Sequence, residues 1–266
     1  MNFPENEKYP YSFPIADTHA HYDDKKFYDV RDELLGKMKD FGVELILNNS
    51  IDCHRSAKDV LEMAKKYDIC YAAIGVHPEC LEGNGPLDKD LLVSLLKRDK
   101  VVALGEIGLD YHWSPETADE QKRVFCEQLE IAKDLGLPVT VHDREAHGDI
   151  MEILKKYRPK GAVHCFSGSA ESAIETVKLG MYIGIGGVLT FNNARKLVEV
   201  AEAVPLERIL LETDAPYLAP TPYRGKLCHS GMIVRVAEKL AQIKGIDTET
   251  VLKVTFQNAK ELYGIK

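Results

Sequence analysis

The chain has 266 residues, of which 45% are hydrophobic and 29% are charged, and its formal net charge at pH 7 is −8. This balance excludes a disordered chain and is sufficient to bury a sizeable core. The negative charge argues against a long basic groove for duplex nucleic acid, because such binding needs many lysines and arginines to neutralise phosphates. It does not exclude an enzyme that grips only a strand end, where bound divalent cations supply the local positive charge.

The sequence carries no membrane-spanning or disulfide signal. No stretch approaches the roughly 18 uninterrupted apolar residues that span a bilayer, and residues 1–8 do not combine a basic segment with an apolar one. We therefore expect a cytoplasmic protein without a membrane partner. The six cysteines show no C-x-x-C spacing, so we expect reduced, mostly buried thiols.

Short apolar runs, often rich in β-branched residues, predict eight strands. The runs extend from Pro14 to Thr18, Val43 to Asn48, Cys70 to Val76, Val101 to Glu106, Pro138 to His142, Gly161 to Cys165, Met181 to Ile185 and Arg208 to Glu212. Amphipathic segments between and after them predict helices from Val30 to Phe41, Ala57 to Tyr67, Leu91 to Arg98, Ala118 to Leu135, Ile150 to Tyr157, Ala170 to Leu179, Ala194 to Ala203 and Met232 to Lys244. Several helices stop at a glycine, as at Gly42, Gly136 and Gly180, which indicates a left-handed C-cap.

A strand followed by a helix, eight times over, predicts parallel βα units, and the length matches the roughly 250 residues of one TIM (β/α)8 barrel. We therefore expect an α/β fold with a single TIM-barrel domain over residues 1–266, and a last helix, Thr248 to Tyr263, across its outside. An open doubly wound sheet is the alternative. Against it, no G-x-G-x-x-G or P-loop follows the first strand, and the glycine run from Gly184 to Gly187 is explained by tight packing at a barrel rim.

Six side chains of metal-binding type stand singly at or just beyond the ends of these strands. They are His19, His21, Glu106, His142, His164 and Asp214. Residues two apart on a strand project the same way, so His19 and His21 can reach one ion. The carboxyl ends of the strands form the face on which barrel enzymes assemble their sites. Isolated ionisable groups meeting there would be costly to bury without a metal, so we predict a metal-dependent hydrolase.

These ligands divide between two divalent ions. We expect the first ion to be held by His19, His21 and Asp214, the second by His142 and His164, and both to be bridged by Glu106. Ions about 3.5 to 4 Å apart share a hydroxide and stabilise both the attacking and the leaving oxygens of a displacement at phosphorus. Zn, Mg, Mn, Fe and Ni all remain candidates. Asp214 is the expected general base, with a purely ligating role as the alternative.

Seven segments, spread in order over nearly the whole chain, add a further signal. They are Asp17-Thr18-His19-Ala20-His21, Gly75-Val76-His77-Pro78, Gly105-Glu106-Ile107-Gly108-Leu109-Asp110-Tyr111, His142-Asp143-Arg144, His164-Cys165-Phe166-Ser167-Gly168, Glu212-Thr213-Asp214-Ala215-Pro216-Tyr217-Leu218 and Pro222-Tyr223-Arg224-Gly225-Lys226. Together they resemble the TatD-type metal-dependent deoxyribonucleases of the amidohydrolase superfamily. The resemblance implies a TIM barrel, divalent metals at the six ligands named above, and hydrolysis of DNA phosphodiester bonds, commonly from a 3′ end.

One departure from that pattern follows Lys226. Many members continue with Asn-Glu-Pro, whereas this chain has Cys228-His229-Ser230. We therefore expect the loop after the eighth strand to shape a different substrate contact.

Four further side chains are candidates for binding substrate. His77, at the end of the third strand, is placed to donate to a phosphate oxygen. Arg144, Arg224 and Lys226 are placed to pair with phosphates, with ordinary surface ion pairs as the alternative.

Aromatic and second-sphere candidates lie close by in the sequence. Tyr111 or Trp113 would stack on a base, since aromatic faces hold single strands without demanding a sequence; packing under a loop is the alternative. Glu212, two residues before Asp214, is expected to orient a ligand.

These patterns favour a 3′-5′ exonuclease that cleaves DNA through a hydroxide bridging two metals, with single strands or 3′ ends as its partner and RNA as a further substrate. The alternative enzyme is a metal-dependent ester or amide hydrolase, such as an aminoacyl-tRNA deacylase, because the same hydroxide attacks a carbonyl carbon. The non-enzyme alternative is a barrel that stores or senses metal. A monomer is the default expectation, because no exposed apolar seam argues for a dimer.

Overall fold

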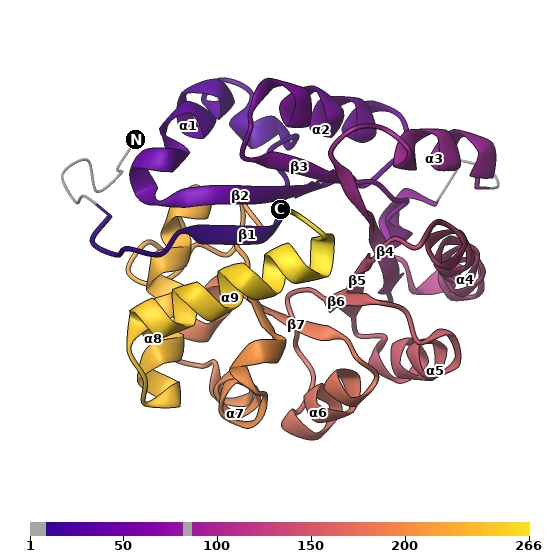
Figure 1. The fold of residues 1–266 in the computed structure, drawn as a ribbon. Helices are drawn as coiled ribbons and strands as arrows, with labels where there is room; N and C mark the ends of the chain where they lie inside the picture. Colours follow the sequence, from indigo (N-terminus) through magenta and orange to yellow (C-terminus); the bar gives the residue numbers. More distant parts are fainter. Residues whose placement is uncertain (1–8, 82–86) are drawn as a thin grey trace.

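Parallel strands form the centre of the molecule. The computed structural model describes residues 9–81 and 87–266. Eight strands pair in the order β1-β2-β3-β4-β5-β6-β7-β8, so that each lies beside the next one along the chain. They are β1 (Ile15–Ala20), β2 (Val43–Asn49), β3 (Cys70–Ala73), β4 (Val101–Asp110), β5 (Val139–Arg144), β6 (Gly161–Val163), β7 (Tyr182–Ile185) and β8 (Ile209–Leu211). This order confirms the predicted TIM (β/α)8 barrel and excludes the doubly wound alternative (Figure 1).

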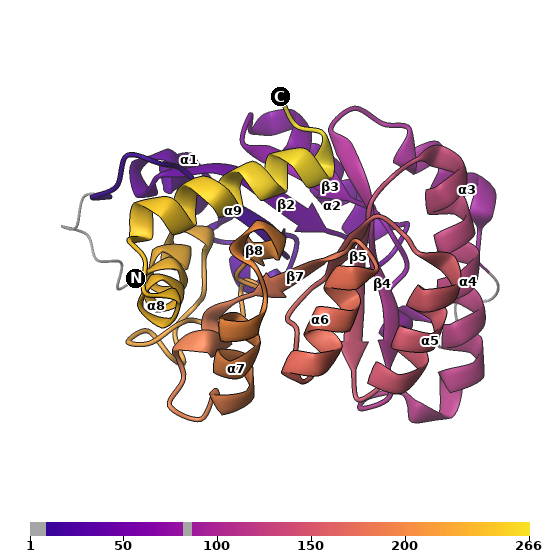
Figure 2. The same cartoon turned by 60° about the horizontal axis from the view of Figure 1, so that its bottom comes forward.

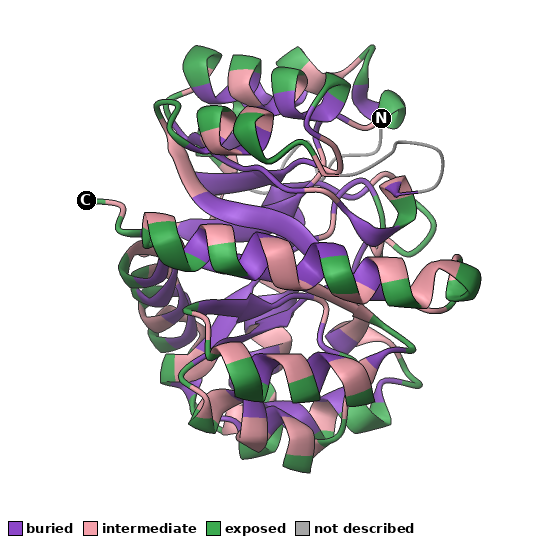
Figure 3. Cartoon of the chain, turned by 90° about the vertical axis from the view of Figure 1, so that its right-hand side faces the viewer, coloured by how far each residue is buried: buried purple, intermediate pink, exposed green. Residues whose placement is uncertain are grey.

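Helices follow the strands and surround them (Figure 2). They are α1 (Arg31–Lys37), α2 (Arg55–Lys66), α3 (Lys89–Leu96), α4 (Ala118–Leu135), α5 (His147–Tyr157), α6 (Ala170–Lys178), α7 (Arg195–Ala203), α8 (Ile233–Lys244) and α9 (Thr248–Tyr263). The strands are buried, and the helices expose only their outer sides (Figure 3). Helix α2 buries Ala57, Val60 and Ala64, which share one helical face. No helix within residues 9–81 and 87–266 is long and apolar enough to cross a membrane.

The glycines predicted to end helices have left-handed backbone. Gly42, Gly136 and Gly180 have φ angles of 75°, 67° and 93°. Glycine adopts these angles without the steric cost that a side chain would add, so the chain turns sharply from helix to strand at these points.

The barrel closes where the chain leaving β8 meets β1. The N–H of Asp214 donates to the carbonyl of His19 at 2.9 Å, and the N–H of His21 donates to the carbonyl of Ala215 at 2.7 Å. The hydroxyl of Thr18 also donates to the carbonyl of Leu211 at 3.1 Å. The first and last parts of the sequence are therefore joined at the carboxyl end of the barrel.

Strand β3 is shorter than the sequence predicts, because it stops at Ala73 and not at Val76. Ile74 still bonds to the backbone of β4, but the next two N–H groups have side-chain partners in place of strand partners. The N–H of Val76 donates to Gln128 Oε1 at 2.8 Å, and that of Gly75 donates to Ser50 Oγ at 3.2 Å.

Strand β4 is longer than predicted and continues four residues past Glu106, to Asp110. It stays paired with β5, with Gly108 opposite His142 and Asp110 opposite Arg144. The expected position of Glu106 at the strand end is therefore wrong. It lies in the middle of a strand of 10 residues, and its side chain points into the barrel mouth from below the rim.

The last helix, α9, covers the amino-terminal end of the barrel and not simply its outside. The side-chain amide of Asn258 donates to the carbonyls of Leu206 and Ile209, where β8 begins, at 2.9 and 2.8 Å. Its apolar residues Leu262 and Tyr263 join the cluster of side chains that fills the barrel interior. Helix α9 does not cover the opposite end of the barrel, where the strands have their carboxyl ends and the candidate metal ligands lie.

The glycine run after β7 packs tightly, as predicted. A Cβ at Gly184 would lie 2.3 Å from Glu212 Oε2, and one at Gly187 would lie 1.9 Å from the carbonyl oxygen of Leu218. These glycines let the β8 segment approach the end of β7 and do not form a phosphate loop.

All six cysteines are free thiols, in agreement with their spacing. Cys53, Cys70 and Cys228 are buried, and the other three are partly exposed.

Candidate metal centre

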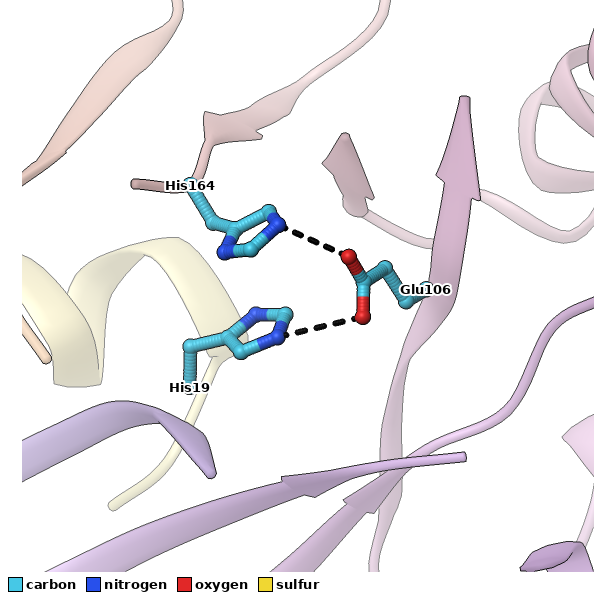
Figure 4. Close-up of side chains that lie close together, drawn as sticks. All are labelled: His19, Glu106 and His164. Carbon is cyan, nitrogen blue, oxygen red and sulfur yellow. Dashed lines mark ion pairs between the residues drawn. The ribbon is translucent and has the colours of Figure 1, made fainter. Parts of the chain in front are cut away.

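Glu106 lies at the middle of a cluster of histidines in the barrel mouth. Its Oε1 is 2.7 Å from His164 Nε2 and 2.8 Å from His142 Nδ1. Its Oε2 is 3.2 Å from His19 Nε2 and 3.3 Å from His21 Nε2. Figure 4 shows the carboxylate between His19 and His164. The two oxygens thus face different pairs of histidines, which is the arrangement expected of a carboxylate that bridges two ions.

Asp214 joins the pair of histidines on β1. Its Oδ1 is 3.5 Å from His21 Nε2 and 4.0 Å from His19 Nε2. The backbone of Asp214 has a φ of 58°, which aspartate tolerates better than most residues. Asp17 stabilises this turn, because its carboxylate accepts bonds from Thr213 N–H at 3.0 Å and Thr213 Oγ1 at 2.6 Å.

The cluster contains three overlapping groups of donor atoms, counted over residues 9–81 and 87–266. Within each group the ligand atoms lie within 4.8 Å of one another. The groups are His19 with His21 and Asp214, His19 with Glu106 and His164, and His77 with Glu106 and His142. The structure thus brings together all six predicted ligands, and it adds His77.

The outer ring nitrogens show which histidines present a lone pair to the centre. His21 Nδ1 lies 2.9 Å from the carbonyl oxygen of Asn49, which only accepts, so Nδ1 keeps its proton and a neutral ring has its lone pair on Nε2. His142 Nε2 lies 3.0 Å from Asp110 Oδ2, which leaves Nδ1 to face the centre. Carbonyl and carboxylate partners of this kind hold metal-binding histidines in place.

The donor set fits divalent cations. His19 is fully buried, and burial lowers its pKa to about 3, so its imidazole is neutral. Burial also acts on His142, yet hydrogen bonds to Asp110 and Glu106 outweigh it and raise the pKa to about 10. The carboxylates therefore require positive charge in the cluster, supplied by protons on imidazoles when no metal is present. Divalent cations would take the lone pairs and supply that charge instead.

Asp110 is a member of the site that the sequence interpretation did not single out. Its buried carboxylate holds His142 through Oδ2, and its Oδ1 accepts the N–H groups of His112 and Trp113, both at 2.9 Å. Burial raises its pKa, but the bonds from His142 and these N–H groups outweigh that and lower it to about 2. Asp110 lies four residues after Glu106 on the same strand, so period-two alternation would have placed both on one face.

Glu212 acts on the centre through the backbone. Its Oε1 accepts the N–H of Cys165, the residue after His164. Cys165 has a φ of 43°, an angle that few non-glycine residues adopt. Burial raises the pKa of Glu212 to about 8. The sequence predicts that Glu212 orients a ligand. Its carboxylate contacts the backbone of the turn that follows His164 and not the His164 ring.

His77 differs from His21 and His142 in the partner of its outer ring nitrogen. Its Nε2 faces Glu106 Oε1 at 3.5 Å, but its Nδ1 accepts the N–H of Glu79 at 3.2 Å. Because burial lowers its pKa, the ring is neutral, and its single proton must lie on Nε2. His77 therefore presents a donor, not a lone pair, to the barrel mouth.

The three predicted phosphate contacts are exposed residues at the end of strand β5 and on the loop after β8. Arg144 ends β5, and its guanidinium lies 5.3 Å from the centre of the Trp113 ring. Arg224 lies 4.0 Å from the centre of the Phe191 ring. Lys226 follows on the same loop, where its N–H donates to the carbonyl of Tyr223 at 2.9 Å. None of the three is an established substrate contact, and all stay predictions.

The two aromatic candidates are in different surroundings. The hydroxyl of Tyr111 donates to Asp149 Oδ2 at 2.6 Å, which ties its side chain to α5. Trp113 has 60% of its surface exposed. Of the two, Trp113 is the one available to a ligand.

The departure at Cys228-His229-Ser230 is buried behind the mouth. Cys228 and Ser230 are fully buried, and Ser230 N–H donates to the hydroxyl of Tyr22 at 3.0 Å. His229 lines a separate cavity of about 280 Å³ between Tyr9 and α8, to which no metal-centre residue contributes. These three residues are thus part of the packing under the loop after β8, and the expected effect of that loop on substrate contacts stays a prediction.

Comparison with known proteins identifies the family. A family model described as TatD related DNase matches residues 16–264. The chain belongs to the TatD family. It is 39% identical over 256 residues to the uncharacterized metal-dependent hydrolase YabD of Bacillus subtilis, covering 94% of this chain and 99% of that protein. It is 32% identical over 248 residues to a Salmonella typhimurium protein named 3'-5' ssDNA/RNA exonuclease TatD, covering 90% and 95%.

The solved structures agree with this assignment to the TatD family. The crystal structure of YjjV, a TatD homolog from Escherichia coli K12, matches with a TM-score of 0.86 and 32% identity over 95% of this chain and 98% of that one. The predicted resemblance is confirmed, and the protein is a metal-dependent hydrolase of the TatD family with a TIM-barrel fold.

Proposed function

We propose that this hydrolase is a 3′-5′ exonuclease that cleaves DNA phosphodiester bonds with the help of two divalent metal ions. The observation that carries the proposal is the carboxylate of Glu106, whose two oxygens face separate pairs of histidines at 2.7 to 3.3 Å. A site with a bridging carboxylate suits displacement at phosphorus. The Salmonella relative that is named as an exonuclease for ssDNA and RNA supports the choice of substrate.

The proposed division of the ligands follows the two pairs of histidines that face the two oxygens of Glu106. His19, His21 and Asp214 would hold one ion, His142 and His164 the other, and Glu106 both. When bound, such ions neutralise phosphoryl oxygens and lower the pKa of water. The metal is one of Zn, Mg, Mn, Fe or Ni, since these donors do not select among them.

Asp214 is the proposed general base. Burial raises the pKa of its carboxyl group, but the hydrogen bond and charge of His21 outweigh burial and lower it. The group is therefore ionised and able to take the proton of the attacking water. With 23% of its side chain exposed, it can pass that proton on to solvent.

His77, Arg144, Arg224 and Lys226 are the proposed substrate contacts. His77 holds its proton on Nε2, directed into the mouth, where it would donate to a non-bridging phosphoryl oxygen whose charge grows in the transition state. Arg144 ends strand β5, and Arg224 and Lys226 lie on the loop after β8; all three would pair with phosphates farther along the nucleic-acid strand.

The test uses metal-stripped protein reloaded with each candidate metal. It is incubated with single-stranded DNA labelled at the 3′ or the 5′ end and, in parallel, with aminoacyl-tRNA. We expect stepwise loss of nucleotides from the 3′ end, abolished in Asp214→Asn and retained in Asp119→Asn, whose side chain is fully exposed on α4.

Other outcomes would replace the proposal. Release of the amino acid alone would make the protein an aminoacyl ester hydrolase. Tight metal binding without turnover of either substrate would favour a storage or sensing role.

A further inference from the structure

Among the residues that the structure describes, three of the four large hydrophobic side chains that are exposed to solvent lie at one end of the barrel. The four are Tyr28, Trp113, Tyr217 and Ile246. The three aromatic ones lie on loops that follow strands β1, β4 and β8, at the same end as the metal centre. Ile246 alone follows a helix, α8, and so lies at the opposite end. Exposed aromatic rings around a catalytic mouth call for a ligand with flat apolar parts.

Trp113 is connected to the metal centre by two hydrogen bonds. Its N–H donates to Asp110 Oδ1 at 2.9 Å, and Asp110 Oδ2 holds His142 at 3.0 Å. The first of these bonds is made by the backbone, so the backbone of Trp113 is held beside one side of the centre, while 60% of the residue stays exposed.

Tyr217 is connected to the other side of the centre. Its N–H donates to the carbonyl of Asp214 at 2.9 Å, and its hydroxyl donates to Asp24 Oδ2 at 2.8 Å. These two bonds hold the ring in one orientation, and 43% of the residue is exposed.

The two rings lie on opposite sides of the metal centre. Trp113 follows β4 and Tyr217 follows β8, and strands four apart in a closed barrel of eight lie across from each other. A ligand that touches both rings must pass over the metals.

Each ring is accompanied by a cation from a neighbouring loop. The Arg144 guanidinium lies 5.3 Å from the centre of the Trp113 ring, and Lys26 Nζ lies 3.9 Å from that of Tyr217. A flat apolar surface next to a positive charge, repeated on both sides of a phosphodiester site, matches the repeating unit of a nucleic-acid strand.

We propose that Trp113 and Tyr217 stack against the unpaired bases on the two sides of the bond to be cleaved. Arg144 and Lys26 pair with the phosphates next to those bases. The inference rests on the proposed exonuclease function and makes it more specific: the site selects a single strand with a base on each side of the reacting phosphate. A base held in a duplex cannot reach either ring.

Trp113 is the single tryptophan of the chain, so its fluorescence reports on one side of the proposed site directly. The metal-loaded protein is titrated with a phosphorothioate-linked oligothymidylate, which resists hydrolysis, and with the same strand made of abasic units. We expect quenching of the tryptophan emission by the first strand and none by the second.

Affinity is measured in parallel with a labelled strand by fluorescence anisotropy. Trp113→Ala and Tyr217→Leu should each weaken binding by about 5- to 150-fold, the range for loss of one stacked base. Trp113→Phe and Tyr217→Phe should restore most of it, and Ile246→Ala should have no effect. With the abasic strand, the variants should bind like the parent protein.

Two results would overturn the inference: an unquenched tryptophan, or equal losses with the thymidylate and abasic strands. Because binding is measured without cleavage, these results are separate from those that test the exonuclease. A protein that binds as described but cleaves no strand would contradict the proposed function and leave the stacking site in place.

Discussion

Three histidines in the barrel mouth differ in the partner of their outer ring nitrogen. His21 donates to a backbone carbonyl and His142 to Asp110, so each ring, once neutral, turns a lone pair inward. His77 accepts from a backbone N–H and turns a proton inward. Residues of the same type at one site therefore have different chemistry, decided by atoms on the far side of the ring.

Asp110→Asn tests the support of His142. The variant keeps an acceptor near His142 Nε2 but loses the charge that favours the inward lone pair. We expect the affinity for metal at His142 to fall by about 10- to 100-fold, measured by competition with a chromophoric chelator. Asp119→Asn, an exposed change, should leave affinity as it is. Equal affinities in Asp110→Asn and the parent protein would show that the bond does not position the ring.

The variant His77→Ala tests whether His77 donates a hydrogen bond to the substrate or binds a metal ion. If His77 donates to the substrate, kcat on single-stranded DNA should fall by about 10²- to 10³-fold, the range for one transition-state donor. The bound metal, measured by mass spectrometry, should stay the same. His77→Gln, which offers an amide N–H, should recover part of the rate. Loss of metal in His77→Ala would instead make His77 a ligand.

At the scale of elements, the strand positions follow from the apolar runs, whereas strand lengths depend on partners elsewhere. β3 ends early because Gln128 on α4 and Ser50 after β2 take its N–H groups. β4 continues to Asp110 because β5 stays paired with it through Arg144. Such pairings join residues far apart in the chain and leave no periodic signal in the segment itself.

Gly108→Ala tests the contact between β4 and β5. Gly108 has a φ of 146°, and a Cβ there would lie 2.0 Å from the carbonyl oxygen of His142. We expect a loss of at least about 2 kcal/mol in the free energy of unfolding, measured with urea, because the strands must separate. Gly148→Ala is the matched control: nothing lies within 4 Å of its Cβ position, and in helix α5 it should gain up to about 1 kcal/mol. Equal stability of the two variants would contradict the close packing.

At the scale of the whole molecule, the clustering of the candidate metal ligands could be predicted from sequence because barrel topology brings all carboxyl ends of strands to one face. Spacing alone therefore located His19, Glu106 and Asp214, which come from distant parts of the chain. Spacing could not predict that Asp110 holds His142, nor which ring nitrogen of His77 carries the proton. Both depend on hydrogen-bond partners in the folded chain. The burial of His229 behind the mouth depends on the packing of α8, which the loop sequence does not reveal.

The stability of the fold should depend on pH through His229. Burial lowers the pKa of His229 from 6.5 to about 4 in the folded chain. Between these values the unfolded state binds a proton that the folded state does not, so stability is full above pH 6.5 and falls as pH drops toward 4. From pH 7 to 4.5 the loss from this residue is on the order of 2 kcal/mol.

Urea unfolding of metal-free protein at the two pH values measures this loss. His229→Gln should lose less stability than the parent protein over the interval, by the amount given above. His54→Gln, at an exposed histidine on the surface, should not differ from the parent. An unchanged pH dependence in His229→Gln would show that the buried ring is not responsible.

The closure of the barrel also determines when metal binding becomes possible during synthesis. The hydrogen bond from Asp214 to His19 belongs to the junction that closes the barrel. This junction joins residues up to 196 positions apart in the sequence, such as Thr213 and Asp17. A nascent chain on the ribosome contains both histidines of β1 from the start, yet it lacks the carboxylate that completes their ion site until β8 has emerged. An ion held by His19, His21 and Asp214 would therefore bind late, and it would mark a chain whose synthesis and folding have both reached the last strand.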